Sequence, residues 1–363
     1  MEKYKVLSLF SGLGGFDMGF EGDVVVHKDS VNDLLSTRES SHEDFVLLQP
    51  HNFDIVFQND ILEGAKEIFS LNNPTKNKDN YVTRSIYDLL NENYNFPKAD
   101  VVIGGFPCQD FSHCGKRTGF ESNKAHDLKS KVNSSKSNNR GTLYKSFVEV
   151  VKRVKPKIFV AENVYGLLTM EGEPIKQIVS DFQDLGYQVK YQDIYCPNFG
   201  IPQTRRRVII MGINTQMLQD TEKLPSNWNE IEKNKGVTCS IGKYFKHLKE
   251  PDETTDISQM MYSKAKKLEK GQGQTQINPE SFAPTMRAEH HGNIEFRRHE
   301  TPDGLPERRL TIREAGLIQT FSPDYIFTTK KNQKAYKFIG NAVPPLLAYL
   351  VADKVTDLLI AHF

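Results

Sequence analysis

The sequence predicts an α/β fold in which a mostly parallel sheet is covered by helices on both faces. Short apolar runs rich in β-branched residues recur in the first part of the chain, for example at 101–103 (VVI) and 158–161 (IFVA). Continuous runs of this kind are typical of parallel strands that are buried on both faces. A glycine-rich turn follows the first such run and precedes a helical pattern, which is the order of a βαβ unit.

The first strand is expected at residues 4–10, and Gly12, Gly14 and Gly15 follow it. Glycine lets the backbone turn tightly and approach a ligand where a Cβ atom would collide. A strand, a glycine-rich turn and a helix together are typical of nucleotide binding, although a purely structural turn is an equal alternative for one such loop.

The second strand is expected at residues 53–58, and Asp60 follows it with a carboxylate able to accept hydrogen bonds from a ribose. Asp60 lies 45 residues after Gly15, against about 20 in a compact βαβ unit. A surface charge is therefore the alternative interpretation of Asp60. The spacing also indicates an insertion at residues 21–52, with strand-like segments at 24–27 and 45–48 and no function assigned from the sequence.

The strand at 101–103 ends at two glycines, and Pro107 then precedes Cys108. In open α/β sheets, ligands bind beyond the carboxyl ends of the strands, so Cys108 falls where reactive groups are usually found. Proline fixes its own φ angle and stiffens the support of a nucleophilic thiolate. The alternative is a small buried cysteine, which is the commoner role of an intracellular cysteine.

Two further strand regions carry charged residues that suit an active site. Glu162 lies near the end of the strand at 158–164. Two more strands flank residues 198–208, where Gln203, Arg205 and Arg207 are expected on one face because strand side chains alternate. Two guanidinium groups on one face would clamp an anion or a carbonyl group, and Arg206 would face the other way.

The composition excludes few classes of function, but it indicates the cellular compartment in which the protein works. Hydrophobic residues make up 38% and charged residues 26%, as in an ordinary globular protein. No apolar run approaches bilayer length and the N-terminus does not resemble a signal peptide, so we expect a cytoplasmic protein without membrane association. The four cysteines contain no CxxC pair, which argues against a disulfide framework or a zinc site. Basic clusters such as 297–313 suggest phosphate contacts, with a solvated face as the alternative.

Six motifs occur in an order that resembles one known family. They are FSGLGG at 10–15, GGFPCQ at 104–109, ENV at 162–164, QTRRR at 203–207, RLTIREAG at 309–316 and GNAVPP at 340–345. In content and order they closely resemble the cytosine-5 DNA methyltransferases of bacterial restriction-modification systems. The resemblance implies a Rossmann-like S-adenosylmethionine-dependent methyltransferase domain at 1–218 and 335–363, with a smaller, irregular target-recognition domain at 219–334.

The resemblance also implies a chemistry and its residues. Cys108 would attack C6 of a flipped-out cytosine, Glu162 would stabilise N3, Arg207 would contact O2 and Arg205 would hold the site, with no metal required. The donor, S-adenosylmethionine, would be bound by Phe10, Ser11, Gly12, Gly14, Gly15, Asp60, Ile61, Ser85, Ile86, Thr142, Asn341, Ala342 and Val343. DNA would be contacted by Gln109, Ser112, Gln203, Arg287, Arg297 and Arg298. Ser85 stands where the family commonly has an acidic residue.

The expected partner is double-stranded DNA, with a cognate restriction endonuclease acting separately and a monomer as the usual form. RNA is one alternative substrate, because a tRNA-methylating branch shares these motifs, but the long segment from 219 and the lack of a CFT-like motif favour DNA. A catalytically silent relative is the other alternative, and the presence of Cys108, Glu162, Arg205 and Arg207 argues against it. The target sequence and the modified cytosine are not predictable from these residues.

Overall fold

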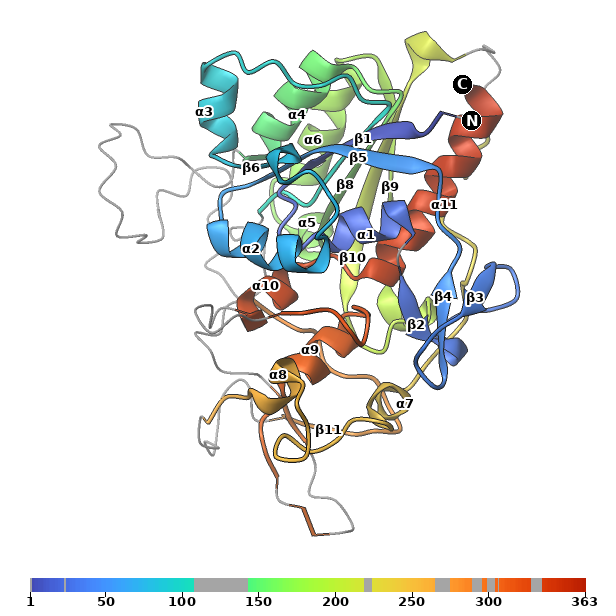
Figure 1. The fold of residues 1–363 in the computed structure, drawn as a ribbon. Coiled ribbons are helices and arrows are strands. Elements are labelled where there is room, and N and C mark those ends of the chain that lie inside the picture. The colour runs from blue at the N-terminus through green and yellow to red at the C-terminus, as the bar shows by residue number, and fades with distance from the viewer. Residues whose placement is uncertain are drawn as a thin grey trace.

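A seven-stranded sheet forms the centre of the molecule, in the order β6-β5-β1-β7-β8-β10-β9 (Figure 1). The computed structural model describes residues 2–22, 24–107, 143–218, 224–264, 275–288, 296–298, 304–305, 307–327 and 335–363. The strands are β1 (Tyr4–Leu9), β5 (Phe53–Asp60), β6 (Tyr81–Thr83), β7 (Val101–Gly104), β8 (Ile158–Val164), β9 (Tyr187–Tyr195) and β10 (Arg206–Asn214). The expected α/β fold with its mostly parallel sheet is confirmed.

Strand direction brings the motif-bearing segments to one edge of the sheet. β1 pairs in parallel with β5 and β7, and β7 pairs in parallel with β8, so their carboxyl ends lie together. β10 is antiparallel to β8, with Arg207 opposite Val164. The first residues of β10 therefore lie at the same edge as the last residues of β8.

Helices cover both faces of this sheet (Figure 1). They are α1 (Gly15–Glu21), α2 (Glu63–Asn72), α3 (Ile86–Asn91), α4 (Leu143–Val154), α5 (Gly166–Thr169), α6 (Pro174–Gln183), α10 (Ala335–Asn341) and α11 (Pro345–His362). Short 3-10 turns lie at Lys28–Ser30, Lys78–Asn80, Cys196–Asn198 and Thr215–Met217. Alternate residues of β1 show the two faces, because Val6 packs with α1 and α11 whereas Leu7 packs with α3, α4 and α6. Among the helices of the described residues, none is long and apolar enough to span a membrane.

The insertion at residues 21–52 forms a small antiparallel sheet of its own. Its strands are β2 (Val25–His27), β3 (Thr37–Glu39) and β4 (Phe45–Leu48), in the order β2-β4-β3. The strand-like segments expected in the insertion are therefore confirmed. In Figure 1 this sheet lies between α11 and α7.

The region after β10 is built from short elements. These are α7 (Ile241–Phe245), α8 (Ile257–Met260), β11 (Thr275–Ile277), β12 (Phe296–Arg298) and α9 (Ile312–Ile318). Tyr244 of α7, Met286 and Leu317 of α9 share one buried cluster with Ile68 of α2 and Ile339 of α10. The same cluster contains Leu13 of the glycine-rich turn, so this region packs against that turn and against α10, which carries the start of the C-terminal motif.

The C-terminal motif lies between two helices. α10 ends at Asn341, and α11 begins at Pro345 after an extended Pro344. A proline disfavours helical geometry in the residue before it, and proline is well accommodated at the first position of a helix. Residues 342–344 therefore form a break between α10 and α11.

Candidate active site

The glycine-rich turn lies directly above the end of β1. Phe10, Gly12 and Gly14 have φ angles of 56°, 53° and 76°, and glycine is the residue best suited to this left-handed region. A Cβ atom at Gly14 would lie 2.7 Å from the ring of Phe69. Ser11 is buried and its amide donates to the carbonyl of Asn59 at 2.9 Å, which joins the turn to β5.

Asp60 ends β5 and holds this turn. Its carboxylate accepts the backbone N–H groups of Gly12, at 3.0 Å, and Leu62, at 2.9 Å. Burial raises the pKa of Asp60, and hydrogen bonds from backbone amides oppose that shift. A carboxylate has about four lone-pair positions, and the amide of Ile61 also bonds to Asp60, so about one position remains for a ligand. Ile61, the next residue, is 62% exposed and offers an apolar surface beside the carboxylate.

Ser85 and Ile86, two residues predicted to bind the donor, differ in their exposure to solvent. Ser85 precedes α3 and is half-buried, while Ile86 is buried in the cluster beneath the sheet. The side-chain amide of Asn59 donates to the carbonyls of Val82 and Arg84, both at 2.9 Å. Through Asn59, the structure links this loop to Ser11. Asp88, one turn into α3, is exposed.

The C-terminal motif returns to the glycine-rich turn, as the sequence indicated. A Cβ atom at Gly15 would lie 2.4 Å from the carbonyl oxygen of Val343, so only glycine permits this approach. A Cβ atom at Gly105 would lie 3.1 Å from Oε2 of Glu162 and 4.0 Å from Val343. Ala342 and Val343 are buried and Asn341 is exposed. Segments far apart in the sequence therefore meet at one point.

Glu162 pairs with Arg207 at that point. Glu162 is 7% exposed, and Nε of Arg207 lies 2.7 Å from its Oε1. The two groups form a largely buried ion pair. Arg206 faces away, as expected, since it pairs with Asp193 and stacks at 3.7 Å on the ring of Tyr165.

The proline that precedes Cys108 is the last described residue of its loop. Cys108, Gln109, Ser112 and Thr142 lie outside the described residues. The side-chain amide of Asn163 donates to the carbonyl of Phe106 at 3.4 Å, so the end of β8 supports the loop that leads to Cys108. Sequence reasoning assigned no role to Asn163, although its place in the ENV motif was an available signal.

Gln203 and Arg205 do not lie with Arg207 on one strand face, because β10 begins only at Arg206. Gln203 is fully buried, and its amide bonds to the carbonyl of Ile318, to Gln319 and to the amide of Met286. The expected DNA contact of Gln203 is therefore corrected to an internal one in this structure. Sequence reasoning assigned no role to Gln319, the buried C-cap residue of α9.

Arg205 likewise bonds within the protein. Its guanidinium donates to the carbonyls of Met286, Gly340 and Ala342 at 3.0 to 3.3 Å. Burial and, secondarily, the charge of Arg207 lower the pKa of Arg205 to about 9. The expected clamp of two arginines is therefore wrong for Arg205, which bonds to backbone carbonyls. Arg207 alone of the two pairs with Glu162.

The remaining candidates for DNA contact lie in the region after β10. Arg287 is exposed, and its backbone lies 2.4 Å from where a Cβ atom of Gly340 would be. Arg297 and Arg298 are in β12, which pairs with β11, and their side chains lie outside the described part of the structure.

Comparison with known proteins agrees with this arrangement. Residues 4–357 match the family described as C-5 cytosine-specific DNA methylase. The type II methyltransferase M.BsuRI of Bacillus subtilis is 30% identical over 98% of this chain and 80% of its own length. The type II methyltransferase M1.HphI of Haemophilus parahaemolyticus is 30% identical over 96% of this chain and 86% of its own.

Two solved structures are similar in fold. The S. pombe Dnmt2 methyltransferase has a TM-score of 0.61 at 16% identity, covering 98% of this chain and 99% of its own. The Entamoeba histolytica methyltransferase EhMeth has a TM-score of 0.56 at 15% identity, covering 99% of both chains.

Proposed function

The chain belongs to the C-5 cytosine-specific DNA methylase family, and we propose that its reaction takes place where β1, β5, β7, β8 and the start of β10 meet. The protein is a DNA (cytosine-5-)-methyltransferase of the type II restriction-modification class. The observation that supports the site is the close approach of Gly105 to both Glu162 and Val343, which a Cβ atom at Gly105 would meet at 3.1 and 4.0 Å. It joins the loop before Cys108 to the carboxylate and to the C-terminal motif.

The donor pocket lies at the glycine-rich turn in this proposal. S-adenosylmethionine, when bound, supplies the methyl group. The residues fit such a ligand, because the space beside Gly12 is open, with only the Asp60 carboxylate 4.0 Å from where a Cβ atom would be, and that carboxylate can accept a further hydrogen bond. The exposed Ile61 would pack on its base, and Asn341, Ala342 and Val343 would close the pocket, with Ser85 and Thr142 at its margin.

The target cytosine must leave the DNA helix, since C6 is unreachable in the base stack. The thiolate of Cys108 would then form a bond to C6, and the electron pair of the C5–C6 double bond would become available at C5. After C5 has gained a methyl group, loss of its proton to a base or water restores the double bond and releases the Cys108 thiolate. The Pro107 backbone and the Asn163 contact fix the approach of this loop.

Glu162 and Arg207 would act on the other edge of the same base. A carboxyl group beside N3 and the 4-amino group can hydrogen-bond both and offset the charge that thiolate addition creates. Arg207 holds that carboxyl at 2.7 Å and would reach O2. Arg205 acts through its backbone partners rather than by touching the base.

We assign residues 1–218 and 335–363 to catalysis and 219–334 to target recognition. Double-stranded DNA would lie between these regions, with contacts from Arg287, Arg297 and Arg298 and from the loop that contains Gln109 and Ser112. The names of the relatives support a restriction-modification setting, in which a separate endonuclease cuts unmodified DNA. Action on chromosomal DNA implies a cytoplasmic protein, and we propose a monomer.

The test uses purified protein, labelled S-adenosylmethionine and duplex DNA that contains 5-fluorocytosine, because fluorine at C5 blocks the final elimination. A covalent adduct is expected with the wild type and not with Cys108→Ala, which should still bind donor and DNA. Bisulfite mapping of unmodified plasmid DNA then locates the methylated sequence. Transfer to tRNA alone, or donor binding without transfer to either nucleic acid, would contradict the proposal.

A further inference from the structure

A buried polar contact joins the insertion to the recognition region. The hydroxyls of Ser30 and Tyr244 are 2.8 Å apart, and both residues are buried. Asn234 is fully buried, accepts the backbone N–H of Asn32 at 2.9 Å and donates to the carbonyl of Ser30 at 2.8 Å. The ring of Phe45 meets that of Tyr244 edge to face, with 5.6 Å between centroids. These contacts fix the position of α7 on the insertion.

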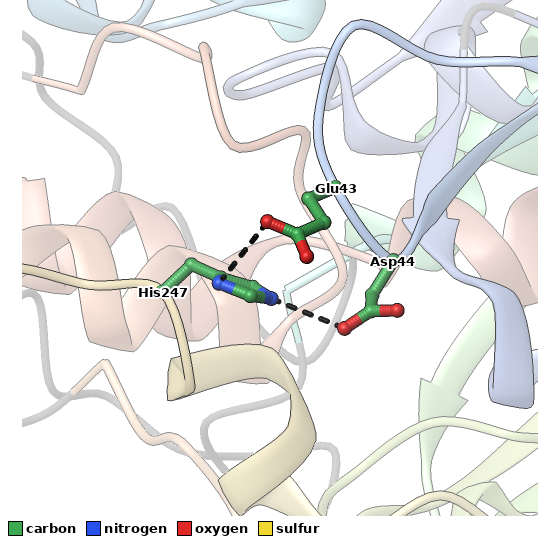
Figure 2. A group of neighbouring side chains, drawn as sticks. All are labelled: Glu43, Asp44 and His247. Atoms are coloured by element: carbon green, nitrogen blue, oxygen red, sulfur yellow. Dashed lines mark hydrogen bonds and ion pairs between the residues drawn. The ribbon is translucent and has the colours of Figure 1, made fainter.

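A charged cluster adds to this contact at the surface. Figure 2 shows His247 between two carboxylates, at 3.1 Å from Asp44 and 3.8 Å from Glu43. Asp44 also pairs with Lys28 at 2.5 Å and with Lys246 at 3.0 Å. These three residue types resemble a metal site, but two ammonium groups already occupy the Asp44 carboxylate. The cluster is therefore an ion-pair network between the insertion and the end of α7.

Two more ion pairs extend the same boundary. Lys243 of α7 pairs with Asp29 of the insertion. His42 lies 2.6 Å from Asp324, which follows α9. The contact therefore spans both ends of the region that we assign to recognition.

From α7 the backbone connection continues to the active site. The amides of Ile241 and Gly242 donate to the carbonyls of Ser281 and Pro279 at 2.9 and 2.8 Å. Two residues after Ser281, Ala283 exchanges backbone hydrogen bonds with Pro202 and Thr204. The same segment reaches Met286, whose carbonyl accepts from Arg205.

We propose that the insertion positions the recognition region: it holds α7, and α7 holds the segment 279–287 that ends beside the catalytic edge. This rests on the proposed assignment of 219–334 to target recognition. A positioning element differs from a merely stabilising one in its kinetic effect. Loosening it raises KM for DNA and weakens discrimination between sites, whereas uniform destabilisation lowers the melting temperature alone.

The test compares three variants that each remove one buried hydroxyl. Tyr244→Phe and Ser30→Ala delete the two partners of one hydrogen bond. Tyr187→Phe is the matched control, because its hydroxyl donates to the carbonyl of Pro156 at 2.8 Å on the other side of the sheet. For each protein, KM for plasmid DNA, kcat, S-adenosylmethionine affinity and melting temperature are measured. Bisulfite sequencing gives the methylation ratio between the target and sites that differ by one base pair.

Tyr244→Phe and Ser30→Ala should each raise KM for DNA about fivefold, the factor that one net hydrogen bond contributes. Both should lower the methylation ratio while donor affinity stays unchanged, and the double variant should be no worse than either single one. If Tyr244→Phe and Ser30→Ala change KM for DNA and the methylation ratio no more than Tyr187→Phe does, the inference is wrong.

A charge exchange gives a second test. Asp29→Lys and Lys243→Asp should each weaken discrimination at low salt, and the two together should restore it. Failure of the double variant to recover would count against positioning by this boundary. A chimera that carries the recognition segment of a relative separates the two proposals, because an unmoved target site would refute the assignment of 219–334 itself.

Discussion

At the scale of single residues, the site depends on the Glu162 carboxylate, which has Arg207 on one side and Gly105 on the other. Arg207 neutralises Glu162 from one side, and the absence of a side chain at Gly105 leaves its Oε2 accessible from the loop that leads to Cys108. An alanine at Gly105 would place a methyl group 3.1 Å from that oxygen, closer than most Cβ contacts. The exposed edge of the carboxylate is therefore the part available to a base.

Glu162→Gln should lower kcat by about 10²- to 10⁴-fold, the usual contribution of a positioned acid or base. Affinity for DNA should change far less, because the amide keeps the shape of the carboxyl. Single-turnover methylation and a DNA-binding assay check both values. Glu173→Gln is the control, since Glu173 precedes α6, is exposed and pairs with Lys176. Wild-type turnover in Glu162→Gln would refute the role assigned to it.

His51 provides a pH-dependent contribution to stability. Its ring packs 4.3 Å from that of Tyr349, and burial lowers its pKa. The unfolded chain therefore binds a proton more readily, so acidification below about pH 6.5 favours unfolding. The free energy of unfolding of the wild type, minus that of His51→Phe, should fall from pH 8 to pH 5 in urea titrations. A difference that is constant with pH would exclude proton linkage at His51.

The limits of sequence reasoning at this scale have a physical cause. Asp60 was located correctly beside the glycine-rich turn because a strand end and a turn fix their neighbours locally. Gln203 and Arg205 were placed on a common face with Arg207 by period-two alternation, which holds only within a strand. β10 begins at Arg206, so the rule did not apply to them.

At the scale of elements, strands and helices with strong periodicity were predictable. The strands β1 and β8 lie where the sequence indicated, at residues 4–10 and 158–164. α7 and α8 were not predictable, because elements of four or five residues are too short for a periodic pattern. Their positions depend on contacts such as Tyr244 with Ser30, between residues 214 positions apart.

Arg205 connects the segment before β10 to Met286 and to the end of α10, and its loss should lower stability. Arg205→Met removes the guanidinium donor from the carbonyls of Met286 and Gly340, whereas the carbonyl of Ala342 still accepts from Gln319 at 3.3 Å. We therefore expect a loss of about 3 kcal/mol in the free energy of unfolding. Arg206→Met is the adjacent control, and an exposed pair such as Arg206–Asp193 contributes about 1 kcal/mol at most. Urea denaturation measures both. If Arg205→Met does not fold, Arg205→Lys should show an intermediate loss, and equal stability of all variants would contradict the role.

At the scale of the whole molecule, the fold class was predictable but one strand direction was not. The apolar run of β10 has the same composition whether the strand is parallel or antiparallel. Its direction follows from the short connection between β9 and β10, because a parallel arrangement of two consecutive strands needs a longer crossover. β10 therefore runs antiparallel to β9. That reversal is what brings Arg207 to Glu162.

The assignment of target recognition is testable at the same scale. Exchanging residues 219–307 for the corresponding segment of a relative with another target should move the methylated site, as bisulfite sequencing would show. The exchange retains α9, whose capping residues Thr311 and Glu314 bond each other within the helix. It also replaces Asn234 and Tyr244, so we expect lower stability and weaker discrimination than in either parent. A second chimera that exchanges only 249–307 keeps the contact with the insertion and should discriminate better. An unmoved site in both chimeras would place recognition elsewhere in the chain.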